Sequence, residues 1–248
     1  MVNTILVGNG YWGSKILEKL NKLSKVIEVQ SSNNYNPNVF EKADWVFVST
    51  PFSTHYRIVK DCILKGVNVF VEKPFTNSVE EAFELIQLAR EKNVLLYIDN
   101  VFLHRSELLE FSSLALNSIK FIWHKFGPFN DSIINDLLYH DLYILISKFG
   151  FFPIEKFLVN VYQPDKLIVE FIYSNIKIEI DYNRRIHCIQ KSIFIDNISI
   201  NFLNEYQDPL YEIIFSCLYH KHNFFSNQEL NLKTMILFND IKKHIDLH

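Results

Sequence analysis

The chain has 248 residues, of which 48% are hydrophobic and 21% charged, and its formal net charge is −3. This composition supplies enough apolar surface for a buried core and excludes a disordered chain. Lysines and acidic residues are interleaved along the chain, so the charge pattern disfavours nucleic acid and anionic membrane surfaces as partners. The length fits one large domain or two modest ones, and the expected partner is a small molecule.

The cysteines and histidines offer no metal or disulfide framework. Cys62, Cys188 and Cys217 are odd in number and far apart, which excludes paired disulfides and a zinc site with paired thiolates. We expect these thiols to be reduced and buried. The HKH stretch at 220–222 places two histidines at i and i+2, which do not share a helix face. We therefore predict no metal site.

The beginning of the chain carries no targeting pattern. A strand-like run starts at once, without a basic segment before it. Every apolar run is interrupted by charge before about 18 residues, the length at which a membrane helix is considered. We therefore expect a soluble, cytoplasmic protein without a membrane partner.

Apolar strand-like runs alternate with helical patterns over the first half of the chain. Strands are predicted at residues 3–7, 26–29, 45–49, 67–71 and 94–98, and helices at 14–23, 54–65 and 78–92. Strands that alternate with helices build a mostly parallel sheet with helices on both faces. We therefore predict a doubly wound α/β domain over residues 1–117.

From about residue 118 the pattern becomes rich in short strands. A helix is predicted near 132–148, strands at 156–162, 167–173, 176–182, 187–195 and 198–203, and closing helices at 209–220 and 228–245. These elements predict a C-terminal α+β domain over residues 118–248. Its sheet should be open and mostly antiparallel, with the closing helices able to pack back on the first domain. An open sheet with one apolar face favours a homodimer or homotetramer.

A glycine-rich turn separates the first strand from the first helix. Gly8, Gly10 and Gly13 have the G-x-G-x-x-G spacing. The first glycine allows a tight turn, the second lets the backbone approach a pyrophosphate, and the third lets the helix pack on the strand. The helix N-terminus also offers N–H groups to phosphates. We predict a Rossmann dinucleotide turn formed by Gly8, Asn9, Gly10, Tyr11, Trp12 and Gly13.

The end of the second strand lacks the acidic residue that usually binds the adenosine ribose. The chain has Gln30, Ser31, Ser32 and Asn33 at this place. We expect Ser31 and Ser32 to hydrogen-bond the ribose. They would not repel a 2′-phosphate, yet no arginine is nearby to hold one. Both NAD and NADP therefore stay open as the cofactor.

Two further strand ends carry polar motifs. Thr50 and Pro51 end the third strand and His55 opens the next helix, while Glu72, Lys73 and Pro74 follow the fourth strand. Ligands bind at the carboxyl ends of strands in such sheets, and a proline restrains the residue before it, with a cis peptide as an option. An isolated E-K-P would be a surface turn. In this context we predict that all six residues line the cofactor cleft.

The stretch NDLLYHDLY at residues 135–143 sets polar groups into an apolar helix. At about 100° per residue, one helix face carries Asp136, Tyr139, His140 and Tyr143. A carboxylate four residues before a histidine can hydrogen-bond it and hold its tautomer, as an acid–base group requires. The alternative is a solvated polar stripe, which the two tyrosines disfavour. Asp141 falls among apolar positions and is predicted to be structural.

Together, the glycine turn, T-P-x-x-x-H, E-K-P and D-x-x-x-H motifs resemble those of the Gfo/Idh/MocA family, named for glucose-fructose oxidoreductase and inositol dehydrogenase. The resemblance extends to TNSVEEAFELIQLAREKNV and DPLYEIIFSCL. It implies a Rossmann domain, a C-terminal domain with an open sheet, and NAD(P)-dependent oxidation or reduction at a hydroxyl or keto carbon of a sugar, cyclitol or sugar nucleotide. It also implies that the lysine touches the reacting hydroxyl and that the aspartate and histidine complete the site.

The roles predicted from this resemblance are specific. Lys73 should polarise the substrate oxygen, His140 exchange the hydroxyl proton, and Asp136 orient His140 or the substrate. Apart from the resemblance, the stretch at 100–105 follows a strand end, which predicts substrate contacts for Asn100 and for His104 or Arg105, with a surface loop as the alternative. Tyr139 is a further predicted substrate contact. The chain departs from the family at Phe52, often an asparagine, and at Ser132 to Asn135, often a glycine run. The segment between the second strand and Thr50 is also short, which predicts a loose fit of the adenosine end.

Two other functions compete with a sugar dehydrogenase. The first is a catalytically silent dinucleotide sensor or scaffold, against which the retained Lys73, Asp136 and His140 count. The second is a hydrolase or lyase that uses bound NAD as a transient redox relay. Turnover and the net change in reduced nicotinamide separate the three.

Overall fold

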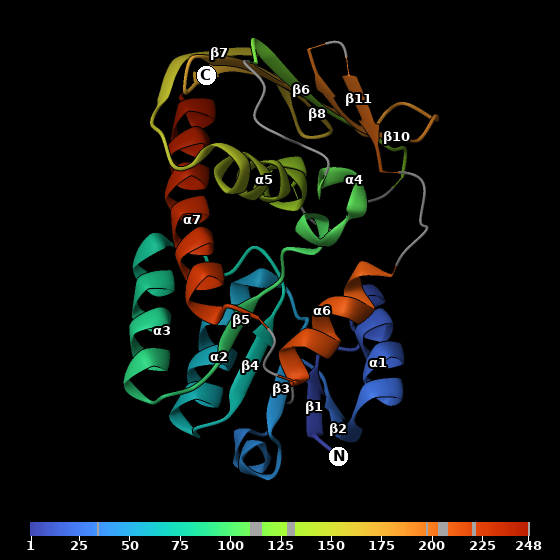
Figure 1. The fold of residues 1–248 in the computed structure, drawn as a ribbon, viewed down its shortest axis with the longest axis vertical. Helices are drawn as coiled ribbons and strands as arrows, with labels where there is room; N and C mark the ends of the chain where they lie inside the picture. The colour runs from blue at the N-terminus through green and yellow to red at the C-terminus, as the bar shows by residue number, and fades with distance from the viewer. Residues whose placement is uncertain are drawn as a thin grey trace. The chain divides into compact units, whose positions relative to one another are not determined.

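The computed structural model describes residues 1–33, 35–109, 116–127, 132–196, 198–202, 208–219 and 222–247, and Figure 1 traces the chain. The chain divides into two compact units: unit 1 comprises residues 1–101 and 208–235, and unit 2 comprises residues 102–207 and 236–248. The domain boundary expected between residues 117 and 118 stays a prediction. No helix in the described part of the chain has the length and apolar character needed to cross a membrane.

Unit 1 contains a five-stranded sheet with the order β2-β1-β3-β4-β5. Its strands are β1 (Asn3–Val7), β2 (Lys25–Gln30), β3 (Trp45–Val48), β4 (Asn68–Val71) and β5 (Leu96–Ile98). All neighbouring strands are parallel. The inner strands are nearly continuous apolar runs, as expected where both faces of a parallel sheet are covered. The predicted doubly wound fold is confirmed.

The described residues of unit 1 form four α-helices and the beginning of a fifth, and side chains cap the start of some of them. The helices are α1 (Tyr11–Leu23), α2 (His55–Leu64), α3 (Val79–Glu91), α6 (Pro209–Leu218) and the first part of α7 (Phe224–Asp246). The Ser78 side chain accepts a hydrogen bond from the N–H of Glu81 at the start of α3, and Asp208 does the same for Tyr211 before α6. Between β2 and β3 the described residues form a short 3-10 helix, Pro37–Lys42.

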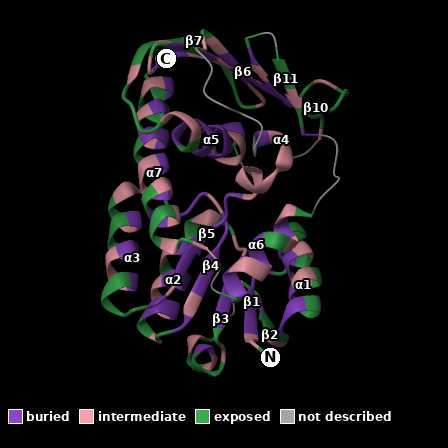
Figure 2. Ribbon diagram, in the orientation of Figure 1, coloured by how far each residue is buried: buried purple, intermediate pink, exposed green. Residues whose placement is uncertain are grey.

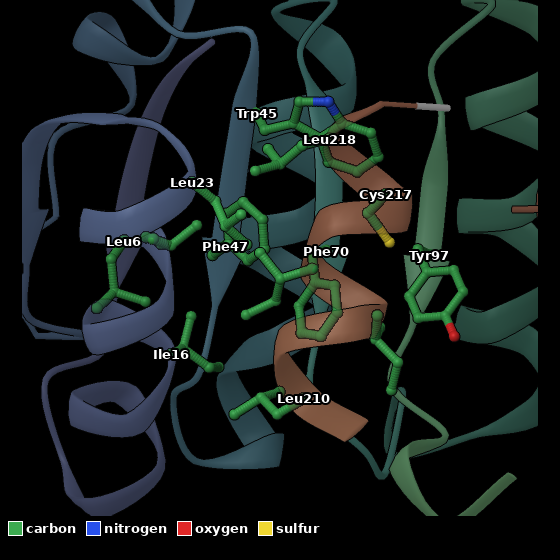
Figure 3. Close-up of a cluster of buried hydrophobic side chains, with 13 residues drawn as sticks. Leu6, Ile16, Leu23, Trp45, Phe47, Phe70, Tyr97, Leu210, Cys217 and Leu218 are labelled. Atoms are coloured by element: carbon green, nitrogen blue, oxygen red, sulfur yellow. The ribbon is translucent and has the colours of Figure 1, made fainter. Parts of the chain in front are cut away.

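One cluster of the core of unit 1 lies on the sheet face that α1 and α6 cover (Figure 3). A row of aromatic rings crosses neighbouring strands. Phe47 stacks on Phe70 with 5.0 Å between ring centroids, and Phe70 on Tyr97 with 5.6 Å. Ile16 and Leu20 of α1 and four residues of α6 pack over this row; the latter are Leu210, Ile213, Ile214 and Cys217. Helix α6 therefore completes a core that begins about 200 residues earlier in the chain.

Side chains of α7 close the β5 edge of this sheet. Asn227 donates from Nδ2 to the carbonyl of Ile98 at 2.9 Å and accepts from the N–H of Ile98 at 2.9 Å. Its amide group thus takes the place of a neighbouring strand at Ile98. One turn further along α7, Asn231 donates to the side-chain oxygen of Asn100 at 2.8 Å.

Unit 2 contains a six-stranded sheet with the order β11-β10-β6-β9-β8-β7. Its strands are β6 (Ser118–His124), β7 (Ile154–Gln163), β8 (Lys166–Tyr173), β9 (Ile176–Asn183), β10 (Gln190–Ile195) and β11 (Ile198–Asn201). Only β6 and β9 are parallel; the other neighbours are antiparallel. The predicted open, mostly antiparallel sheet is confirmed, although β6 was not expected as a strand.

The helical part of unit 2 differs from the predicted regular helix. A π-helical turn, Ile134–Leu138, leads into α5 (Tyr139–Phe149), which ends at Gly150 with φ +87°. Every residue from 139 to 146 is buried (Figure 2), which excludes the solvated polar stripe. A short helix, α4 (Ser106–Leu109), precedes the sheet.

The cysteine expectation holds for two thiols and is wrong for the third. Cys62 and Cys217 are free and buried, whereas Cys188 is free and exposed. Cys188 lies in an irregular segment before β10, and the neighbouring Ile189 is exposed too.

Candidate active site

The glycine turn of unit 1 fits a dinucleotide. Gly8 has φ +106°, and a Cβ on it would lie 2.1 Å from the carbonyl oxygen of Ser49. A Cβ on Gly13 would lie 1.9 Å from the carbonyl oxygen of Gly8, whereas a Cβ on Gly10 would meet no described atom within 4 Å. The first glycine therefore makes the turn, the third allows close packing, and the second leaves open space for a pyrophosphate.

Positive charge lies next to this turn. The side chains of Tyr11 and Trp12 are exposed, and the Nζ of Lys15 lies 4.7 Å and 4.6 Å from their ring centroids. The lysine adds to the partial positive charge of the α1 N-terminus, which suits a bound diphosphate. Sequence reasoning missed Lys15 because it stands two residues beyond the glycine motif.

Gln30 stands at the end of β2, directly before the two serines predicted to contact the ribose. Gln30 is buried, and its side-chain oxygen accepts a hydrogen bond from the N–H of Asn36 at 2.9 Å. Its carbonyl accepts from the N–H of Gly8 at 2.8 Å. Gln30 thus holds the strand end and the glycine turn together, while the following Ser31 is exposed and Ser32 partly so.

His55 ties two strand ends together. Its Nδ1 lies 2.9 Å from the carbonyl oxygen of Pro74 and its Nε2 lies 2.9 Å from that of Thr50. The ring is buried, and this burial lowers the pKa of His55. His55 was expected to line the cofactor cleft, but its position is that of a clamp which fixes the Thr50-Pro51 and Lys73-Pro74 segments.

The E-K-P motif ends β4 in the same unit as the glycine turn. The Lys73–Pro74 peptide is cis, and the side chain of Lys73 is partly exposed. Glu72 is buried, and burial raises its pKa to about 7. Asp99, which follows β5, is buried too, and burial together with the charge of Glu72 raises the pKa of Asp99.

Asn100 was predicted to contact substrate, but its amide is engaged within unit 1. Its oxygen accepts from Asn227 at 3.0 Å and from Asn231 at 2.8 Å, and its Nδ2 donates to Asn231 at 3.2 Å. The residue is buried. These bonds give Asn100 the role of holding the end of β5 against α7.

In unit 2, His140 lies in an aromatic setting. Its Nδ1 lies 2.9 Å from the hydroxyl of Tyr143, which also accepts from the N–H of Phe102 at 3.2 Å. The His140 ring meets the Phe102 ring edge to face, with centroids 4.6 Å apart. Tyr143 and Phe102 therefore orient the imidazole, a function that the sequence assigned to Asp136.

Asp136 pairs with an arginine that sequence reasoning missed. Its Oδ2 accepts from a terminal nitrogen of Arg184 at 3.0 Å. The Asp136 side chain is 35% exposed and that of Arg184 only 9%. Arg184 directly follows β9. Its ion pair with Asp136, which the D-x-x-x-H spacing does not include, orients this carboxylate. No local pattern around Arg184 indicates this pairing.

The neighbouring Asp141 has a different environment. It is fully buried, and it accepts hydrogen bonds from the indole N–H of Trp123 at 2.9 Å and from the hydroxyl of Tyr182. Burial raises the pKa of Asp141 to about 8. Such a fully partnered acid agrees with the predicted structural role.

Two further predicted substrate contacts are engaged inside unit 2. Tyr139 is fully buried and packs on Tyr143 and Phe238, with ring centroids 6.3 Å and 6.0 Å away. Arg105 donates to Glu107 at 2.9 Å, and its guanidinium lies 5.4 Å from the Phe202 ring centroid. Tyr139 is thus a core residue. Arg105 places its positive charge beside Phe202, one of the aromatic side chains around His140.

Residues 14–100 match a family model described as "Oxidoreductase family, NAD-binding Rossmann fold". Among curated proteins, UDP-N-acetylglucosamine 3-dehydrogenase of Acidithiobacillus ferrooxidans is 28% identical over 126 residues, which are 48% of this chain and 40% of that protein. The NADP-dependent scyllo-inositol 2-dehydrogenase of Bacillus subtilis is 36% identical over 90 residues, 34% of this chain and 25% of that one. The matched segments thus span less than half of these relatives.

Solved structures match nearly the whole chain at low identity. The structure of the Acidithiobacillus ferrooxidans enzyme superimposes with a TM-score of 0.84 and 19% identity, covering 96% of both chains. A Thermus thermophilus dehydrogenase, WlbA, in complex with NAD and UDP-GlcNAcA, superimposes with a TM-score of 0.80 and 14% identity, covering 96% of this chain and 94% of that one. The two-unit architecture is therefore shared with dehydrogenases.

Proposed function

We propose that the protein transfers a hydride between a nicotinamide dinucleotide and a hydroxyl or keto carbon of a sugar nucleotide, because residues 14–100 match the model of the Gfo/Idh/MocA oxidoreductase family with its NAD-binding Rossmann fold. The observation that carries the proposal is the glycine turn, in which Gly8 and Gly13 leave no space for a Cβ. This turn and the E-K-P lysine follow strands of the same sheet. The name of the Acidithiobacillus relative supports a sugar nucleotide as the substrate class.

In the proposed reaction the nicotinamide, when bound, accepts or gives the hydride. Lys73 donates a hydrogen bond to the substrate oxygen and stabilises negative charge on it. His140 takes the hydroxyl proton during oxidation and returns it during reduction. Tyr143 holds the imidazole through Nδ1, and Arg184 holds Asp136, which we propose as a hydrogen-bond acceptor for a sugar hydroxyl.

The cofactor contacts follow from the geometry of unit 1. The turn from Gly8 to Gly13 and the charge of Lys15 would hold the pyrophosphate, and Ser31 and Ser32 the adenosine ribose. His55 fixes the Thr50-Pro51 and Lys73-Pro74 segments, which would border the nicotinamide. For substrate contacts we retain Arg105, while Asn100 and Tyr139 act through their packing.

The sheet of unit 2 is our candidate for association into a homodimer or homotetramer. Its outer strands expose large apolar side chains, among them Leu158 and Tyr162 on β7 and Ile198 on β11. Apolar side chains on open strands are a common surface for self-association.

The test is turnover by the purified chain. Nicotinamide absorbance is followed with NAD or NADP and a panel of UDP- and dTDP-sugars, with inositols for comparison. We expect a change with at least one sugar nucleotide. No bound cofactor and no turnover would favour the silent sensor, and product without a net change in reduced nicotinamide would favour the redox relay.

Two variants test the assigned roles. Lys73→Ala and His140→Ala should each lower kcat by about 10²–10⁴-fold, because each removes a group that acts on the substrate proton or oxygen. Binding of the dinucleotide, measured by quenching of tryptophan fluorescence, should persist. Lys92→Ala and His187→Ala change exposed residues and serve as controls. Near-normal rates in both site variants would remove the proposed roles.

A further inference from the structure

Two acidic residues follow neighbouring strands at the carboxyl ends of the unit 1 sheet. Glu72 directly follows β4 and Asp99 directly follows β5; Val71 pairs with Ile98 in register, and the N–H of Asp99 donates to the carbonyl of Val71 at 2.9 Å. Neighbouring strands are about 4.8 Å apart, and residues two apart share a face. Glu72 and Asp99 therefore continue the row of Phe70 and Tyr97 on the face that α6 covers.

Each carboxyl group keeps one oxygen without a partner among the described residues. Glu72 is 8% and Asp99 4% exposed. The Oε1 of Glu72 and the Oδ1 of Asp99 have no hydrogen-bond partner in the described part of the chain. Two ionised acids directly opposite each other on neighbouring strands would repel, and a buried carboxylate without partners is costly. A proton held between the two groups removes both penalties.

We propose that Glu72 and Asp99 share one proton at neutral pH and act as a single anion that positions the ammonium group of Lys73. The pair is separate from the groups that we assign to hydride and proton transfer. Its relation to catalysis rests on the proposed function, whereas the sharing of the proton does not.

The surrounding charges agree with this arrangement. Burial is the largest cause that raises the pKa of both acids, and the Glu72 charge adds to it for Asp99. The positive charge of Lys73 opposes this shift in both groups, and the backbone N–H groups of Asn100 and Val101 oppose it for Asp99. Cys217 of α6 lies near the pair. Burial and the charge of Asp99 both raise the pKa of its thiol. Such coupled acids lose their protons in two separate steps.

The first experiment follows the shared proton through stability. Urea unfolding is measured from pH 5 to pH 8 for the wild type, E72Q, D99N and the double variant. The folded pair holds protons that the unfolded chain releases at lower pH, so its contribution falls as pH rises. We expect a shallower decline in each single variant and the shallowest in the double variant, with both single variants at least as stable as the wild type at pH 8.

Infrared spectra of the same proteins detect the proton directly. At pH 7 the wild type should show the carbonyl stretch of a buried, protonated carboxylic acid, which shifts in heavy water and weakens or disappears in each single variant. Glu91→Gln replaces an exposed acid on α3 and should leave both readouts unchanged. Equal pH slopes in all four proteins, together with an unchanged infrared band, would overturn the shared proton.

The second experiment tests the positioning of Lys73 without relying on turnover. Amine labelling, read by mass spectrometry of the peptide that contains Lys73, reports how freely the Lys73 side chain reaches the reagent. The single variants keep one anion and should label like the wild type, whereas the double variant should label about tenfold faster because no anion holds the ammonium group in place. An unchanged rate in the double variant would overturn the positioning role. Absence of turnover in every protein would count against the proposed function alone.

Discussion

The two units each bury carboxyl groups, and they do so in opposite ways. In unit 2, both oxygens of Asp141 receive hydrogen bonds, from Trp123 and from Tyr182. In unit 1, Glu72 and Asp99 each keep a side-chain oxygen without a partner among the described residues. Burial raises the pKa of all three acids, so desolvation is common to both places and the hydrogen bonding is what differs.

This difference distinguishes an acid with a structural role from acids that are available for chemistry. A buried acid with partners for both oxygens fixes the packing around it, because removing it would leave two buried donors unsatisfied. An incompletely partnered pair at the carboxyl ends of parallel strands lies where ligands bind in such sheets. Unsatisfied groups of this kind are rare in folded proteins and are found where a protein keeps charge or protons available.

Replacing Asp141 should have the largest effect on stability. Asp141→Ala leaves the Trp123 N–H and the Tyr182 hydroxyl buried without their acceptor, so we expect a loss of about 3 kcal/mol or more in the free energy of unfolding. Urea unfolding, followed by tryptophan fluorescence, measures this loss. Asp99→Asn is the matched replacement of a buried acid in unit 1 and should cost far less. Equal losses in the two variants would contradict the comparison.

The pH dependence of stability should come next in size. The pKa of Glu72 in the folded chain is raised to about 7 and that of Asp141 to about 8, above the ordinary values of carboxyl groups. The folded chain therefore holds protons that the unfolded chain has lost, and the free energy of unfolding should fall from pH 5 to pH 8. The slope is on the order of 1.4 kcal/mol per pH unit for each such proton.

Chemical unfolding at intervals of pH checks this decline. In Asp141→Asn the contribution of that carboxyl group is absent, so the free energy of unfolding of this variant should decline less steeply over the whole range from pH 5 to pH 8. A wild-type free energy of unfolding that rises between pH 5 and pH 8 would show that salt-bridged surface acids dominate instead.

Replacing Arg184 should change stability least and still affect turnover. Asp136 is partly exposed, so Arg184→Gln should cost about 1 kcal/mol or less in unfolding free energy. The freed carboxylate should lower kcat/KM about tenfold, since its orientation is lost. Arg185→Gln changes the adjacent, exposed arginine that pairs with Asp165 and should keep normal kinetics. Equal kinetics of both variants would remove the positioning role of Arg184.

Local sequence patterns were sufficient for the sheet of unit 1 and its helices. The helix predicted at 54–65 is found at His55–Leu64, and the one at 78–92 at Val79–Glu91, because apolar spacing is a local signal and the second helix also has the Ser78 cap. The strand Ser118–His124 escaped prediction. Its position in the interior of its sheet depends on pairing with β9 and β10, more than 50 residues away in sequence.

The π-helical turn at Ile134–Leu138 also has no local signal. It inserts extra backbone before α5, so a helix face calculated at a constant angle does not describe Asp136 and His140 together. Tyr139 and Tyr143, expected beside a polar face, are fully buried for this reason and because α5 is buried along most of its length.

The hydrogen-bond partners of the predicted site residues could not be read from the sequence. Polar residues at strand ends identified His55 and Asn100, but their hydrogen-bond partners lie 19 and 131 residues away along the chain. Arg184 lies 48 residues from Asp136 and belongs to no motif. A sequence motif records which residues recur together, whereas the division between ligand contact and internal clamp depends on contacts that only the folded chain makes.

The amide of Asn227 has a consequence for how copies of this chain behave toward one another. Because its two polar atoms occupy the N–H and the carbonyl of Ile98, an extended segment from another molecule cannot add there as a sixth strand. Outer strands with unoccupied backbone groups are where proteins join into fibres and swapped assemblies. A single side chain of α7 thus protects the dinucleotide-binding sheet from aggregation along β5, at the side of the sheet that ends beside Asp99 and Asn100.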